Sequence, residues 1–181
     1  ICAEKLKGYI KDIERKKIVA VCGAGNNGGD GFVCARYLIN EGLNVKTILI
    51  RDEKDIKGDA KINFEILKKL NAVISKNQQD ILEADIIIDA ILGTGIRGEI
   101  SAKASGAIQK INLSKSFVLS IDIPSGIDSD SGDILGSAVL ANLTVALALP
   151  KLAFKKPLAN FGKVEIADIG IPRQAIEIIK R

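Results

Sequence analysis

Three stretches of the chain carry the residues whose types could do chemistry. They are "GAGNNGGDGF" with Asp30, "DAILGTGIRGE" with Asp89, and "SIDIPSGIDSDSG" with Asp122 and Ser125. Carboxylates exchange protons, and carboxylate, amide and hydroxyl oxygens bind hard cations. The sequence contains no histidine, which excludes histidine-based triads and His-ligated metals. Acid–base work is therefore left to Asp, Glu, Lys, Tyr or Cys.

The first stretch contains the pattern G-x-G-x-x-G, which is typical of a pyrophosphate seated on a helix N-terminus. Asp30 conflicts with that reading, because a carboxylate repels a phosphate. Two interpretations stay open. Asp30 faces a sugar hydroxyl, an amide or a cation, or it only caps the following helix while Asn26 and Asn27 shape the turn. The end of the next strand offers Arg51 beside Asp52, which does not decide between ribose and phosphate recognition.

The other two stretches each place a carboxylate within an apolar strand. Burying Asp89 is costly unless it is paired or coordinated, so it is either a structural acid bonded to loop amides or a ligand to a cation. The glycines that follow Asp89 would let backbone N–H groups approach a phosphate. Arg97 either adds a positive charge that binds this phosphate or is simply solvated. Ser125 has no base to activate it, so we expect a ligand or a hydrogen bond rather than a nucleophile.

Seven apolar runs alternate along the chain with segments of helical periodicity. The strands and helices that they predict position the three stretches. The expected strands are 16–23, 44–50, 72–76, 85–92, 117–124, 143–149 and 163–171, and the expected helical segments are 2–15, 29–42, 57–70, 78–84 and 102–112. This alternation predicts a single-domain, three-layer, Rossmann-like α/β fold with a doubly wound, mainly parallel sheet. In such sheets ligands bind at the carboxyl ends of the strands, where all three stretches lie.

Composition narrows the class of protein. The 181 residues are enough for one α/β domain, and 47% hydrophobic with 27% charged residues is typical of a globular protein. The net charge of +4 is spread out and aromatics make up only 4%, which argues against a nucleic-acid interface. No apolar run is long enough for a membrane span and no signal peptide is recognisable, so we expect a cytoplasmic protein. Of the three cysteines, Cys22 at a strand end and Cys34 inside a helix are expected to be small buried hydrophobes.

Together, "GAGNNGGDGFVCARYL", "DAILGTGIRGEI" and "SIDIPSGIDSDSG" resemble the NAD(P)H-hydrate epimerase family, the YjeF N-terminal domain, from about Lys16 to Pro172. The resemblance implies an isomerase that interconverts the R and S forms of hydrated NADH or NADPH (NADHX, NADPHX). A dehydratase then restores the cofactor. Ala24 and Asn142 depart from the family pattern, which usually has proline and aspartate there.

The resemblance also implies a set of site residues. The substrate would be held by Asn26, Asn27, Gly28, Gly29 and Asp30, by Gly93, Thr94, Gly95, Ile96, Arg97, Gly98 and Glu99, and by Asp122. A potassium ion would be bound by Asn27, Asp89 and Ser125. Lys151 falls where the family often has lysine, and either meets a phosphate or is an exposed loop residue. We predict that Asp122 is the general acid or base and that Asp30 is the second candidate.

Residues 1–172 are expected to form the epimerase domain, and 173–181 a tail or the start of a linker to a dehydratase domain. The family normally begins with a further helical stretch before the position of Ile1, so the chain is expected to be part of a longer protein. A homodimer and a dehydratase, separate or fused, are the expected partners. Two alternatives stay open: a non-catalytic dimerisation or binding scaffold of the same fold, and an NAD(P)-dependent oxidoreductase.

Overall fold

A computed structural model describes residues 1–96, 98–172 and 174–176. Within these residues, seven strands form one sheet in the order β3-β2-β1-β4-β5-β6-β7, and every neighbouring pair is parallel. The strands are β1 (Ile18–Cys22), β2 (Val45–Leu49), β3 (Val73–Ser75), β4 (Ile86–Ala90), β5 (Phe117–Ile121), β6 (Leu143–Leu147) and β7 (Lys163–Ala167). The prediction of a doubly wound parallel sheet is confirmed.

The central strands are continuous apolar runs because helices cover both faces of the sheet. In β1, Ile18, Ala20 and Cys22 belong to the core on one face, while Val19 and Val21 belong to the core on the other. This alternation follows from the two-residue period of a strand. A parallel strand buried on both sides therefore reads as an uninterrupted hydrophobic segment.

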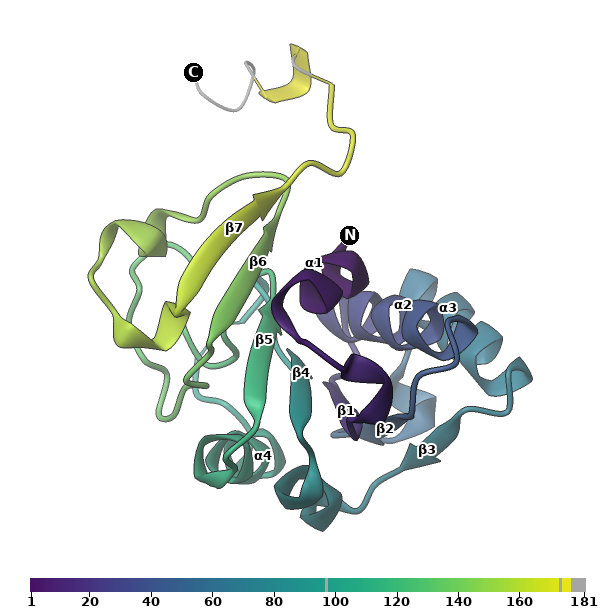
Figure 1. Ribbon diagram of the computed structural model, residues 1–181. Coiled ribbons are helices and arrows are strands. Elements are labelled where there is room, and N and C mark those ends of the chain that lie inside the picture. The colour runs from purple at the N-terminus through teal and green to yellow at the C-terminus, as the bar shows by residue number, and fades with distance from the viewer. Residues whose placement is uncertain (97, 173, 177–181) are drawn as a thin grey trace.

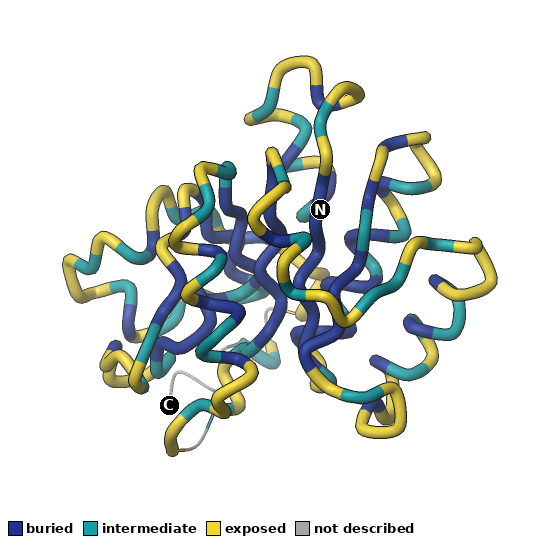
Figure 2. The backbone as a smooth tube through the Cα atoms, turned by 90° about the horizontal axis from the view of Figure 1, so that it is seen from below, coloured by how far each residue is buried: buried dark blue, intermediate teal, exposed yellow. Residues whose placement is uncertain are grey.

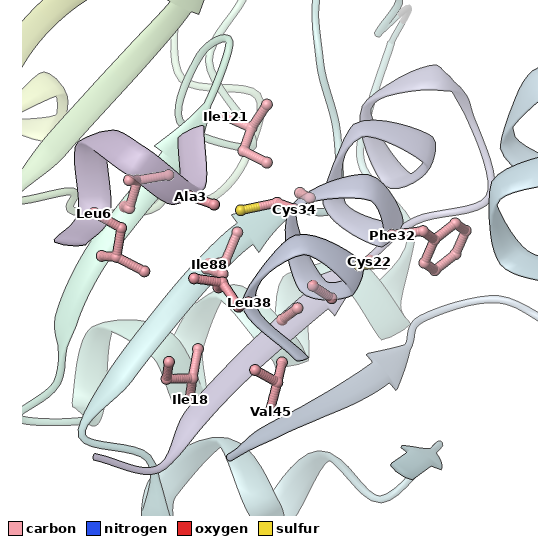
Figure 3. Packing of buried hydrophobic residues seen from close by; sticks show 14 of the residues in the cluster. Ala3, Leu6, Ile18, Cys22, Phe32, Cys34, Leu38, Val45, Ile88 and Ile121 are labelled. Atoms are coloured by element: carbon pink, nitrogen blue, oxygen red, sulfur yellow. The ribbon is translucent and has the colours of Figure 1, made fainter. Parts of the chain in front are cut away.

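In the described part of the chain, the helices α1 to α4 form the outer layers (Figure 1). They are α1 (Cys2–Tyr9), α2 (Asn26–Asn40), α3 (Gly58–Lys69) and α4 (Ala102–Leu113). Residues of α1, α2 and α3 share one core with the sheet, shown in Figure 3, where Leu6, Phe32 and Leu38 lie around the strands. Helix α4 and the 3₁₀ segment Gln78–Glu83 pack on the opposite face. The three-layer prediction is confirmed.

Several element ends differ from the sequence-based expectation. The helix expected over 2–15 ends at Tyr9, and a short 3₁₀ turn (Ile13–Arg15) follows after Asp12 takes a left-handed φ of 52°. The strand expected over 117–124 ends at Ile121, because Asp122 has φ = 70° and leaves the extended conformation. The helix expected from residue 29 begins at Asn26.

Burial follows the layers, with dark central strands inside a lighter, exposed rim (Figure 2). Cys22 and Cys34 are buried and free, as expected, and burial raises the pKa of both thiols. Cys2 is half-buried, and burial raises the pKa of its thiol to about 11. Across the described ranges, no helix has the length and hydropathy needed to cross a membrane.

Candidate active site

A cleft of about 770 Å³ runs along the carboxyl edge of the sheet. It lies where the strand order reverses between β1 and β4, which is the ligand-binding position of doubly wound sheets. Its lining comprises Gly23, Ala24, Gly25, Asn26, Asn27, Asp30, Ile50, Arg51, Asp55, Ile91, Leu92, Gly93, Thr94, Gly95, Ile96, Glu99, Ile100, Ser101, Ala104 and Asp122. Its volume falls within the range of small-molecule and cofactor sites.

The glycines of the first loop let helix α2 pack tightly onto the strands beneath it. A Cβ on Gly28 would lie 2.0 Å from the carbonyl oxygen of Gly23, and a Cβ on Gly31 would lie 2.5 Å from the Cβ of Ala90. Gly28 and Gly29 are themselves buried inside the helix and are not among the residues that line the cleft. Gly28 therefore lets the start of α2 approach the loop after β1, while Gly31, which lies outside the G-x-G-x-x-G pattern, lets α2 pack on β1 and β4.

Asp30 lies in the second turn of α2, on the cleft wall. The helix N-cap is Gly25, and no side chain caps it, so the interpretation of Asp30 as a helix cap is wrong. Burial raises the pKa of the Asp30 carboxyl to about 6, and the negative charge of Asp122 adds to the effect. A carboxyl group with this pKa can both give and take a proton near neutral pH.

Asp122 follows β5 and also lines the cleft. Its backbone N–H donates to the Val145 carbonyl oxygen at 2.8 Å. Its Oδ1 accepts from the Leu147 N–H at 3.1 Å and lies 2.6 Å from the Lys151 Nζ. The side chains of Asp122 and Lys151 are 14% and 15% exposed, so Lys151 is not the exposed loop residue that one interpretation of the sequence expected.

Asp89 is fully buried, and its carboxyl joins β4, β5 and the loop after β5. Oδ2 accepts from the Ser120 hydroxyl (2.8 Å) and the Ser125 backbone N–H (2.9 Å), and Oδ1 accepts from the Ser125 hydroxyl (2.5 Å) and the Ile91 N–H (3.3 Å). Burial raises the pKa of Asp89, and the hydrogen bonds from Ser125, Ser120 and Ile91 oppose that rise. The structural interpretation of Asp89 accounts for these contacts.

The other two expected potassium ligands adjoin this group through Leu92. The Asn27 Nδ2 donates to the Leu92 carbonyl oxygen at 3.0 Å, the Ser125 Oγ lies 3.1 Å from that oxygen, and the Leu92 N–H donates to the same Oγ at 2.9 Å. The Asn27 Oδ1 is buried and has no hydrogen-bond partner among the described residues. A buried, unpaired amide oxygen beside hydroxyl and carbonyl oxygens fits a hard cation. The described residues form no group of three or more His, Cys, Asp or Glu of the kind that holds a metal.

The cleft lining includes most of the predicted substrate residues. Those brought together are Asn26, Asn27, Asp30, Gly93, Thr94, Gly95, Ile96, Glu99 and Asp122, whereas Gly28, Gly29 and Gly98 do not line the cleft and Arg97 lies outside the described residues. Sequence reasoning missed Asp55 and the N-terminal turn of α4, where Ser101 caps the helix. The charged residues "RDE", which follow β2, were the sequence feature that could have indicated that Arg51 lines the cleft.

Fold and site define a Rossmann-like α/β domain with a cleft at its switch point, and the carboxylates of Asp30 and Asp122 are among those that line this cleft. The family described as YjeF-related protein N-terminus matches residues 1–153. The chain belongs to this family.

Relatives agree with this assignment. The chain is 38% identical over 175 residues to the "Bifunctional NAD(P)H-hydrate repair enzyme Nnr" of Moorella thermoacetica, covering 91% of this chain and 33% of that protein. It is 32% identical over 181 residues to the "NAD(P)H-hydrate epimerase" of Elusimicrobium minutum, covering 96% and 82%. The chain thus spans about a third of the bifunctional relatives and most of the shorter ones. The crystal structure of yeast ynu0 (YNL200c) has the same fold, with a TM-score of 0.84, 23% identity, and coverage of 99% and 80%.

Proposed function

We propose that this domain interconverts the R and S forms of hydrated NADH and NADPH. The observation that carries the proposal is the placement of Asp30 and Asp122 on the walls of one cleft at the switch point of the sheet. Family membership and the names of the relatives supply the substrate class. Asp30 argues against an ordinary oxidoreductase because its charge repels a cofactor phosphate, and a scaffold has no need for Asp30, Asp89, Asp122 and Ser125 together.

Epimerisation at the hydroxyl-bearing carbon of the reduced ring needs one proton donor and one proton acceptor. In one route a carboxylic acid protonates the hydroxyl, the C–O bond breaks as the ring nitrogen forms a C=N bond, and water leaves. Water then adds to the other face and gives a proton to a carboxylate. In the other route the hydroxyl loses its proton, the C–N bond opens to a carbonyl and a protonated nitrogen, and the ring recloses on the other face.

Asp122 and Asp30 divide these roles in our proposal. Asp122 sits in an ion pair with Lys151 and accepts the proton. Burial and the charge of Asp122 raise the pKa of the Asp30 carboxyl to about 6. Roughly a tenth of the protein molecules therefore carry a protonated Asp30 at neutral pH, and this carboxylic acid supplies the proton. Proton exchange with water resets the pair after each turnover.

Potassium would be held by Asn27, Asp89 and Ser125. When bound, it supplies positive charge that fixes the loops after β1, β4 and β5 and takes no part in proton transfer. The unpaired Asn27 Oδ1 supports this assignment. The partnership with a dehydratase has support from the bifunctional relatives, while the homodimer and the cytoplasmic location stay predictions.

The proposal is tested by supplying pure R-NADHX together with a dehydratase specific for the S form. Recovery of NADH absorbance then reports epimerisation, measured against the spontaneous rate and with and without potassium. We expect faster recovery with the domain than without it, and loss of that gain in Asp122→Asn. A matched change at the exposed turn residue Asp130, Asp130→Asn, should leave the rate unchanged. If the wild-type domain does not accelerate the recovery over the spontaneous rate, the enzyme assignment is wrong and the scaffold alternative is favoured.

A further inference from the structure

The ion pair behind Asp122 is built into the fold more tightly than a surface ion pair. The Lys151 ammonium has three donors, and three acceptors surround it: the Asp122 Oδ1 at 2.6 Å, the Leu147 carbonyl at 3.1 Å and the Leu149 carbonyl at 3.3 Å. Each of the three N–H donors of the ammonium can therefore be matched to one of these acceptors.

The turn after β6 is shaped around this pair. Leu147 donates its N–H to Asp122 Oδ1 and accepts from Lys151 with its carbonyl, so one residue holds both charges. Asp122 itself and Ala148, the residue after Leu147, both have positive φ values, 70° and 66°. Such values are disfavoured for residues other than glycine, and they persist where surrounding structure holds them.

The two oxygens of Asp122 differ in their surroundings. Both contacts to described residues are made by Oδ1, while the residue itself lines the cleft. Lys151 does not line the cleft, although it touches a residue that does. The lysine thus lies behind the carboxylate, not beside the substrate.

We propose that Lys151 is a positioning residue, which holds the Asp122 carboxylate by Oδ1 and so presents Oδ2 to the substrate. The inference rests on the proposed function, because it assigns Asp122 a proton-accepting role. It replaces the expectation that Lys151 meets a phosphate, since that contact would require the ammonium to leave its three acceptors.

The test compares Lys151→Met, Lys151→Arg and the control Lys156→Met. Lys156 lies in the same segment, but its side chain is 49% exposed and pairs with Asp133. In the epimerase assay we expect kcat of Lys151→Met to fall about 10- to 100-fold with KM within about twofold of wild type, because a misdirected carboxylate loses its alignment. Arginine should restore part of kcat, and Lys156→Met should match wild type.

A second readout does not depend on activity. The Leu147 amide proton reports the bond to Asp122 Oδ1, so its NMR resonance should move in Lys151→Met toward its position in Asp122→Ala and stay in place in Lys156→Met. An unmoved Leu147 resonance overturns the inference. A rise in KM with unchanged kcat also overturns it and favours phosphate binding. If the wild type does not epimerise while the resonance moves as stated, the proposed function fails and the positioning of Asp122 by Lys151 stands.

Discussion

Replacing Asp30 by asparagine should stabilise the protein at neutral pH and leave its stability unchanged in acid. The carboxyl has a pKa of about 6 in the folded protein against an ordinary value of 3.8, with burial as the main cause and the charge of Asp122 as the second. A group that binds its proton more tightly when folded lowers the free energy of unfolding as the pH rises from about 4 to about 6. Above that window the cost is complete, and below it the cost is absent.

The size of the effect follows from that pKa difference. At about 1.4 kcal/mol for each pH unit, the difference corresponds to about 3 kcal/mol. Asp30 is half-buried on a cleft wall, and water screens part of the cost, which leaves about 1–2 kcal/mol. Asparagine has nearly the same shape and no charge, so Asp30→Asn should regain this amount.

Urea unfolding followed by circular dichroism, at pH values from about 4 to about 8, measures the effect as the difference between variant and wild type. The difference should be near zero at the acid end and reach its full size above about pH 6. Asp130→Asn, in an exposed turn, controls for loss of a carboxylate in general. A difference that does not change with pH, or an Asp30→Asn protein less stable than wild type at pH 8, would refute the assigned environment of Asp30.

Three further predictions concern the rest of the site. Gly28→Ala should cost about 2 kcal/mol of unfolding free energy, because its Cβ would meet the Gly23 carbonyl oxygen, while Gly95→Ala, with open space around it, should cost little; urea unfolding compares them. Exchanging choline chloride for potassium chloride should raise the melting temperature by roughly 2–4 °C in wild type and not in Asn27→Ala, and equal shifts in both would exclude Asn27 as a ligand. Arg51 lines the cleft after β2 and forms no ion pair with the described residues, so Arg51→Gln should raise KM about tenfold for NADPHX and change KM by no more than about twofold for NADHX; equal changes would contradict recognition of the extra phosphate.

The central strands could be predicted from the sequence because burial on both faces leaves a continuous apolar run. The run over 16–23 gave β1, and the alternation of its side chains between two cores follows from the pleat. The position of the cleft could also be predicted, since parallel strands bring the loops after β1, β4 and β5 to one edge.

Contacts between distant segments could not be read from the sequence in the same way. Lys151 stands in a loop where a lysine is ordinarily solvated, and nothing in "LPK" shows that Asp122 will lie 2.6 Å from its ammonium. The helix expected over 2–15 failed for a related reason. Charged and apolar residues continue at helical spacing after Tyr9, but Ile10 is extended and ends the helix, and Asp12 is left-handed two residues later.

The start of α2 matters most for the chemistry. A helix that began at residue 29 would place Asp30 among the free N–H groups of its first turn, where the helix dipole stabilises a negative charge. Asparagine and glycine are poor helix formers, yet the helix begins at Asn26, and the missing Cβ of Gly28 leaves room there for the Gly23 carbonyl oxygen. Asp30 then lies one turn further in, without those N–H groups, where burial and the charge of Asp122 raise the pKa of its carboxyl. A shift of three residues in the helix start therefore decides whether Asp30 is a fixed anion or a group that can supply a proton.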